Sequence, residues 1–170
     1  MKIVDGRAEI ADLDRFLDRL RAIGDEHDCA VQAVDADLVV GESHLRAAVE
    51  HADRAFKRGE NVARDPAVEI LLYAAGRRQI NRALRLGVGE GDAPVAVAVN
   101  GLDPAADEAA AADAVRDLLA STDPDAASSD RIDTPAVREF FDVSDAELAA
   151  TDATLAELVR ERVALLDVEK

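Results

Sequence analysis

The sequence predicts an α/β (α+β) domain, in which a single small mixed β-sheet packs with several helices and the C-terminus is helical. Two alanine- and valine-rich segments, CAVQAV and PVAVAVN, have the length and composition of buried strands. Longer segments around them repeat apolar residues at helical spacing. The length of 170 residues and the one cysteine, which excludes an internal disulfide framework, fit a single domain over residues 1–170.

The N-terminal part is expected to alternate strand and helix. Residues 1–10 predict a strand with a turn or bulge at Asp5-Gly6, and residues 11–27 an amphipathic helix. The segments CAVQAV and LVV, on either side of Asp35–Asp37, predict two further strand segments.

The stretch from Ser43 to Gly87 has the strongest apolar pattern of the chain. A first helix is expected from Ser43, as its N-cap, to Gly59. A second helix begins at the Asp-Pro pair of residues 65–66 and is apolar all round, which predicts that it is buried. Gly76 ends this helix, and a third short helix leads to Gly87.

The C-terminal half predicts one more strand and then helices. The segment after the strand at 94–100 is expected to form a helix over residues 102–119, started by Asp103-Pro104 and followed by a loop at 121–129. Short helices are then predicted from Thr134 to Phe140 and after two capping sequences, which begin at Ser144 and Thr154.

The net charge of −16 at pH 7 is extreme. Abundant acids and alanine with scarce lysine are typical of proteins adapted to a salt-rich cytoplasm, where self-repulsion is screened, as in halophilic archaea; the alternative is simply an acidic protein. Since no apolar run approaches the length of a membrane span and the N-terminus lacks a signal-peptide core, we expect a soluble, cytoplasmic protein.

The charge is unevenly distributed. Residues 42–87 contain nine Arg or Lys against six Asp or Glu, whereas the rest of the chain contains eleven against thirty. A locally basic segment in an acidic chain indicates an anionic partner.

Candidate catalytic or metal-binding motifs are weak. The glycine-rich sequence at 87–91 follows a predicted helix, whereas a phosphate-binding loop follows a strand, so an ordinary turn is expected. His44 and His51 are seven residues apart, not the three or four at which two side chains of one helix share a metal ion. The acidic segment 123–133 lacks the ligand alternation of a calcium loop. We therefore expect no metal and no cofactor.

Glu69 is an acid within the predicted buried helix. One interpretation is a partly solvated carboxylate that the helix dipole favours near the N-terminus. The other is an ion pair with Arg77 or Arg78 that positions the guanidinium for a ligand. The sequence leaves both open, and a role of Glu69 in small-molecule catalysis is a weaker third possibility.

Two segments resemble a known family. The patterns AF-x-x-G-x-N-x-A and E-I-L-L-Y-x-x-G-x-R-Q-I within residues 44–87, together with the ending LAELVRERVALLDVEK, are similar to the kinase-binding subunit of the KEOPS complex, the Cgi-type or PRPK-binding (TPRKB) family. The resemblance implies a non-catalytic subunit that binds the small atypical kinase/ATPase of KEOPS and recruits tRNA through its 3′ CCA end. The complex makes threonylcarbamoyladenosine beside the anticodon. A purely structural adaptor that never contacts RNA is the alternative.

The resemblance also suggests site residues. The tRNA-binding set that it implies is Lys57, Asn61, Arg77, Arg78 and Gln79. The kinase-binding set that it implies is Leu155, Leu158, Val159, Val163 and Leu166, although an amphipathic last helix can equally close its own domain.

Overall fold

A four-stranded sheet forms the centre of the computed structural model, which describes residues 1–122 and 134–168. The strand order is β2-β3-β1-β4, and each pairing is antiparallel. The predicted α/β class, the small sheet and the helical C-terminus are confirmed, whereas the sheet is antiparallel rather than mixed. The strands are β1 (Lys2–Ile10), β2 (Cys29–Asp35), β3 (Gly91–Gly101) and β4 (Ser121–Thr122).

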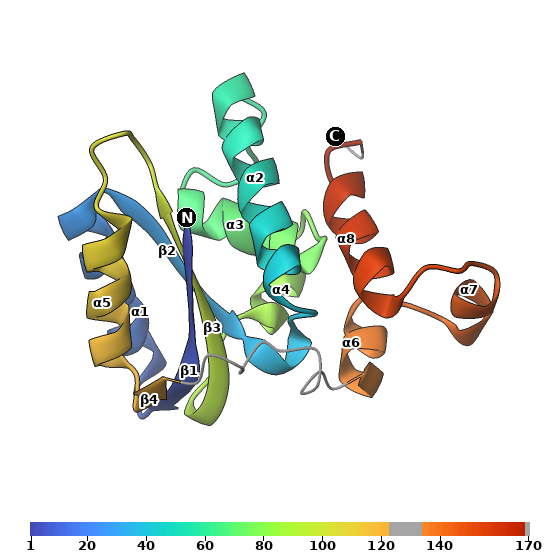
Figure 1. Cartoon of the computed structure of the whole chain (residues 1–170), viewed down its shortest axis with the longest axis horizontal. Coiled ribbons are helices and arrows are strands. Elements are labelled where there is room, and N and C mark those ends of the chain that lie inside the picture. The colour runs from blue at the N-terminus through green and yellow to red at the C-terminus, as the bar shows by residue number, and fades with distance from the viewer. Residues whose placement is uncertain (123–133, 169–170) are drawn as a thin grey trace.

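Two helices cover one face of the sheet. These are α1 (Leu13–His27) and α5 (Glu108–Leu118), which pack side by side (Figure 1). The core between them and the sheet contains Phe16 and Leu20 from α1 and Val115 from α5.

The other face of the sheet is covered by the helices α2 (Glu42–Arg58) and α3 (Pro66–Ala75). On their outer side lies α8 (Leu155–Leu165), so that this half of the molecule has a second helical layer (Figure 1). The shorter helices are η1 (Ala36–Leu38), α4 (Ile80–Ala83), η2 (Leu84–Leu86), α6 (Thr134–Phe140) and α7 (Asp145–Ala149). Among the described residues, no helix is long and apolar enough to cross a membrane.

The first strand differs from its prediction at Gly6. There is no turn or bulge, because β1 pairs with β3 without interruption. The glycine is required for a different reason: a Cβ at this position would lie 2.3 Å from the carbonyl oxygen of Ser121 in β4. Gly6 therefore allows β4 to approach the edge of the sheet.

Two predictions of secondary structure were wrong. The segment LVV does not form a strand, because Asp35 accepts a hydrogen bond from the backbone N–H of Asp37 and so starts the short helix η1. The helix predicted over 102–119 begins only at Glu108, where Asp107 is the N-cap and accepts from the N–H of Ala110.

Other boundaries are close to their predictions. The helix expected with Ser43 as its N-cap begins at Glu42 instead, because the N-cap is Gly41, two residues earlier, which provides no side-chain cap. Thr154 forms the expected reciprocal capping box with Glu157, whose pKa is lowered by the hydrogen bonds from Thr154. Most of the loop expected at 121–129, and the acidic segment 123–133, lie outside the described residues.

Candidate functional site

Glu69 is buried in the first turn of α3 and holds the loop that joins α2 to α3. Its side chain is 1% exposed and accepts hydrogen bonds from the backbone N–H groups of Val62 (3.1 Å) and Ala63 (2.7 Å). The carboxylate is therefore not partly solvated, and Arg77, one of its two suggested ion-pair partners, binds other groups. Glu69 is a structural acceptor for two loop amides that have no helical or strand partner.

The loop also contains Asn61, one of the residues expected to bind tRNA. Its side-chain amide donates to the carbonyl of Ala63 at 2.9 Å, so this group helps to shape the loop. Lys57 lies just before it, exposed at the C-terminal end of α2. These two polar residues are thus at the same end of the α2–α3 pair.

Arg77 lies at the opposite end of this helix pair and is mostly engaged with its own chain. Its guanidinium donates to the carbonyl of Phe140 at 2.9 Å and to Asp142 at 2.5 Å, and its side chain is 21% exposed. These contacts tie the end of α3 to α6. The main role of Arg77 is therefore to position the segment that follows it, and its charge is only partly accessible to a ligand.

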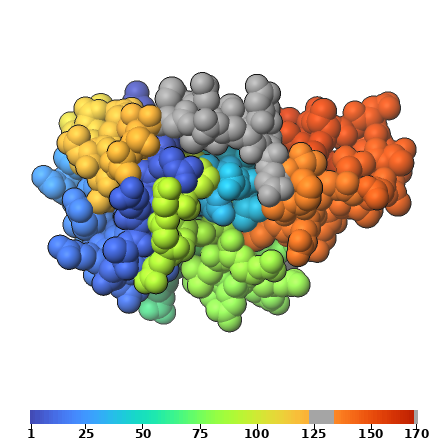
Figure 2. Space-filling view, turned by 90° about the horizontal axis from the view of Figure 1, so that it is seen from below, coloured from blue at the N-terminus to red at the C-terminus, as the bar shows by residue number. Residues whose placement is uncertain are grey.

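The residues after Arg77 form a surface that combines cations with apolar side chains. Arg82 and Arg85 are exposed, as are Ile80 (48%) and Leu84 (56%). The guanidinium of Arg85 lies 5.9 Å from the centroid of the Phe140 ring, which holds it beside α6. We call this surface the basic lip; it consists of Arg78, Gln79, Ile80, Arg82, Leu84 and Arg85. In Figure 2 the segment that carries it (green) projects beside α6 (orange).

The structure divides the tRNA-binding set that the family resemblance implied. The start of α2 lies against the end of α3, where Nε2 of His44 is 2.8 Å from the carbonyl oxygen of Ala74 (Figure 1). The helical rise then places Lys57 roughly 20 Å from His44. Lys57 and Asn61 are consequently one group, and Arg77, Arg78 and Gln79 are another at the far end.

The kinase-binding set lies mostly inside the protein. Leu158, Val159, Val163 and Leu166 are at most 4% exposed, and Leu155 is half-buried. They pack in the core shared with α2 and α3, because the hairpin of these two helices leaves apolar side chains that α8 must cover. In this structure the stripe therefore covers the protein's own core and is not a free surface, while the surface to which a kinase binds stays a prediction.

The outward side of α8 carries different residues. Arg160, Glu161 and Ala164 are exposed, Leu165 is 38% exposed, and Val168, just beyond the helix, is 77% exposed. A partner that docks on α8 in this conformation meets these side chains.

The end of α8 is fastened to the α2–α3 pair by Asp167. Its carboxylate accepts from the hydroxyl of Tyr73 at 2.5 Å and lies 2.6 Å from Nδ1 of His51, and the rings of His51 and Tyr73 stack. Burial, and the hydrogen bond to Asp167, raise the pKa of Tyr73. Sequence reasoning missed this cluster because its members lie far apart in the chain and share no spacing.

His44, the other histidine of α2, is fully buried. Its Nε2 donates to Ala74 while Nδ1 accepts from the N–H of Val40 at 3.4 Å, which defines the neutral tautomer. Burial lowers its pKa to about 4. Among the described residues, no three His, Cys, Asp or Glu side chains come together as metal ligands.

The sequence matches the model of a known protein family. The model of the family described as kinase binding protein CGI-121 covers residues 8–167, which is most of the chain. This chain belongs to the CGI-121 family. No curated protein matches it significantly. As a CGI-121 protein, it is a member of a family defined by the binding of a kinase, and both the basic lip and α8 lie within the matched residues.

Proposed function

We propose that this CGI-121 protein is the non-catalytic subunit of the KEOPS complex that binds the small kinase/ATPase and recruits tRNA through its 3′ CCA end. Its role would be to hold the tRNA while the complex modifies the adenosine next to the anticodon. The family match supports the kinase partner. The observation that supports the tRNA partner is the basic lip, an exposed cationic surface on a chain with a net charge of −16.

The composition of the basic lip suits a single-stranded RNA end. Arginine side chains bind phosphates through paired hydrogen bonds, and the amide of Gln79 can pair with a base edge. The exposed side chains of Ile80 and Leu84 offer apolar contact to unstacked bases. Aromatic stacking, which many single-strand binders use, has no exposed Tyr or Phe among the described residues to support it.

Two arginines of the set have different roles in this proposal. Arg77 orients the start of the basic lip through its bonds to Phe140 and Asp142. Arg82 and Arg85, which the sequence did not single out, join Arg78 as phosphate ligands. Lys57 and Asn61 lie too far away to bind the same nucleotide and would contact RNA further along the strand.

High salt lowers the tRNA affinity that the basic lip can provide without other subunits. The affinity of a protein for a single strand falls with a log–log slope of about −0.7 for each phosphate neutralised. In the salt-rich cytoplasm that the composition predicts, a few arginines give weak binding. We therefore expect the other subunits of the complex to contribute to the affinity for tRNA.

The decisive experiment is a charge reversal on the basic lip. The double variant Arg82→Glu and Arg85→Glu should lose tRNA affinity, and its log–log salt slope should be shallower by about 1.4, as expected for two phosphates. The matched control is Arg15→Glu with Arg19→Glu, which makes the same charge change on the exposed surface of α1. Equal tRNA affinity of the two double variants would overturn the RNA half of the proposal.

A second comparison separates the proposal from a purely structural adaptor. Filter binding of tRNA with and without the 3′ CCA should show a clear preference for the complete 3′ end. An adaptor that only contacts the kinase would show no such preference, yet would still co-purify with the kinase.

A further inference from the structure

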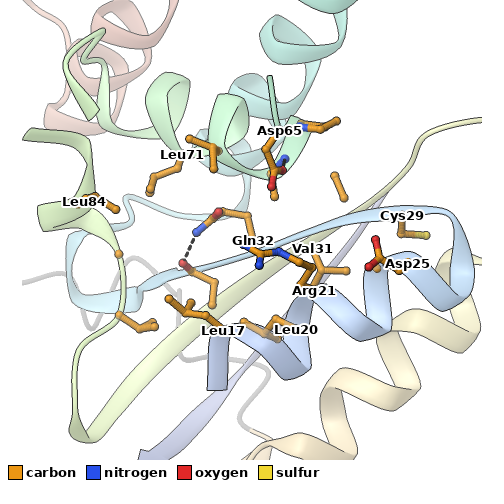
Figure 3. Close-up of a pocket in the computed structure, with 18 of the residues that line it drawn as sticks. Leu17, Leu20, Arg21, Asp25, Cys29, Val31, Gln32, Asp65, Leu71 and Leu84 are labelled. Carbon is orange, nitrogen blue, oxygen red and sulfur yellow. Dashed lines mark hydrogen bonds between the residues drawn. The ribbon is translucent and has the colours of Figure 1, made fainter. Parts of the chain in front are cut away.

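A groove of about 470 Å³ runs along the free edge of the sheet, and Leu84 of the basic lip is one of its lining residues. Its floor is the outer edge of β2, with Cys29 to Ala33 as consecutive lining residues. One wall is a stripe of α1 that includes Leu17, Leu20 and Arg21, and the other is the N-terminal half of α3 (Figure 3). Because β2 ends the strand order, no strand in the described part of the chain lies beside this edge along the groove.

The register shows which backbone groups face the groove. The N–H of Leu102 donates to the carbonyl of Asp28 at 2.9 Å, and these two residues are directly opposite in the β2–β3 register. Antiparallel pairs alternate between hydrogen-bonded and non-bonded positions. Ala30 and Gln32 therefore bond to β3, whereas the N–H and C=O groups of Cys29, Val31 and Ala33 point outward.

Parts of this edge are already covered. The side-chain amide of Gln32 donates to the carbonyl of Ala33 at 2.7 Å, as Figure 3 shows. At Cys29 the carbonyl oxygen lies against α1, since a Cβ on Gly24 would be 2.6 Å from it. Gly87 forms an isolated antiparallel bridge with Val34. The backbone N–H and C=O of Val31 thus remain as an outward pair in the middle of the groove.

We propose that this groove binds a short extended peptide segment of a partner protein, which adds to β2 as an antiparallel strand centred on Val31. The protein's own chain provides the precedent, because the bridge between Gly87 and Val34 already places a second main chain along one end of the same edge. A bound peptide would extend this main-chain pairing along β2 from Val34 towards Cys29. A residue opposite Val31 would exchange both N–H···O bonds with it, as in other strand-addition complexes.

The walls of the groove define the side chains of this peptide. Leu17, Leu84 and Leu102 line the groove and are 39%, 56% and 53% exposed, which is an unusual gathering of large apolar side chains at a surface. Alternate residues of an extended peptide would pack against α1 and α3. About five residues would fill the length from Cys29 to Ala33 at the rise of a strand.

The charges of the groove favour a peptide over a nucleic acid. Among the described residues, its lining includes the carboxylates of Asp25 and Asp65 and the guanidinium of Arg21. This balance repels a polyanion and suits a peptide with a basic residue beside its apolar ones. The proposal does not depend on the KEOPS assignment or on tRNA binding.

The test uses a synthetic peptide with the sequence acetyl-Lys-Val-Thr-Val-Lys-amide and the full-length, isotopically labelled protein. We expect chemical-shift changes at Cys29–Ala33 and slower hydrogen exchange of the Val31 amide. The same peptide with an N-methyl group on the threonine nitrogen cannot donate to the Val31 carbonyl, and it should bind at least 10-fold more weakly. Equal affinity of the two peptides, or no binding at millimolar concentration, would overturn the proposal.

A pair of variants tests the location. Leu17→Lys should block the groove and weaken binding of the unmodified peptide, whereas Leu165→Lys introduces the same charge at a position of nearly equal exposure, 38%, on α8 and should have no effect. Circular dichroism verifies that both variants are folded. If the trinucleotide CCA shifts the Cys29–Ala33 resonances and the peptide does not, the groove is a nucleotide site and the peptide proposal is wrong.

Discussion

The hydroxyl of Tyr73 donates a 2.5 Å hydrogen bond to the carboxylate of Asp167 and thereby joins the buried helix α3 to the end of the last helix. The same carboxylate also contacts His51 of α2. Three segments that are far apart in the chain therefore meet at one side chain. This cluster fixes the position of α8 on the α2–α3 pair.

We expect Tyr73→Phe to lower the free energy of unfolding by about 1–2 kcal/mol, because it removes a hydrogen bond to a carboxylate that keeps His51 as a partner. Urea unfolding of this variant, of Asp167→Asn and of the double variant measures the coupling between the two residues. Additive effects of the two substitutions would show that the hydrogen bond contributes no stability.

Glu69→Gln should lower the free energy of unfolding by about 1–3 kcal/mol, because glutamine keeps the shape but offers a weaker acceptor to two loop amides. Hydrogen exchange should become faster at Val62 and Ala63. Glu60→Gln, an exposed acid of the same loop, is the control for the change in charge. Unchanged exchange at these amides would contradict the assigned role.

His44 should make the protein less stable in mild acid. Since burial lowers its folded-state pKa to about 4 from the ordinary 6.5, the unfolded chain takes up a proton at a higher pH than the native protein does. The contribution of His44 to the free energy of unfolding is therefore fully present above pH 6.5. It should fall by about 3 kcal/mol as the pH decreases to about 4.

The control for this pH dependence is His44→Gln, which cannot titrate. Burial also raises the pKa of Asp53, so acid affects more than one group, and the informative quantity is the difference between the wild-type and variant unfolding curves. If the two proteins lose the same stability between pH 6.5 and pH 4, the buried histidine is not responsible.

Val159→Asp should unfold α8 and cost more than about 3 kcal/mol, because it places a charge in the core. Loss of kinase binding by this variant would then report on folding. Leu165→Asp, on the outward side of α8, should keep the fold and release the kinase if that side is the docking surface. Co-purification with the kinase, together with circular dichroism, distinguishes the two. A folded Leu165→Asp variant with normal kinase binding would exclude Leu165 from the docking surface.

Local patterns predicted the fold well where each element carries its own signal. The strand PVAVAVN, the helix over residues 66–75 and the capping box at Thr154 were found because composition, spacing and cap residues agree. The strand predicted for the segment LVV was wrong because Asp35, three residues before it, accepts a hydrogen bond from the backbone N–H of Asp37. Asp103-Pro104 resembled a helix start, but Asp103 caps only a turn by accepting from the N–H of Ala105.

The candidate site was harder to predict because it depends on contacts between distant segments. The arginine pair at 77–78 was recognised, but only the position of α6 shows that Arg77 is engaged by Phe140 and Asp142. The apolar stripe of α8 was also recognised, but no local pattern distinguishes a stripe that covers its own core from one that binds another protein. Similarly, the basic segment gave no sign that Lys57 lies at the opposite end of the helix pair.

The turn at Gly76 connects the basic lip to α8. Gly76 has a left-handed conformation (φ 59°), and a Cβ there would lie 3.1 Å from the Cβ of Arg162 in α8, so the backbone from which the basic lip begins rests directly on the last helix. We expect that a protein whose binding shifts α8 at Arg162 would also shift the turn that precedes the arginines of the basic lip. Because coupling between binding events is reciprocal, a kinase that tightens the attachment of tRNA would itself be held more firmly once the tRNA has arrived.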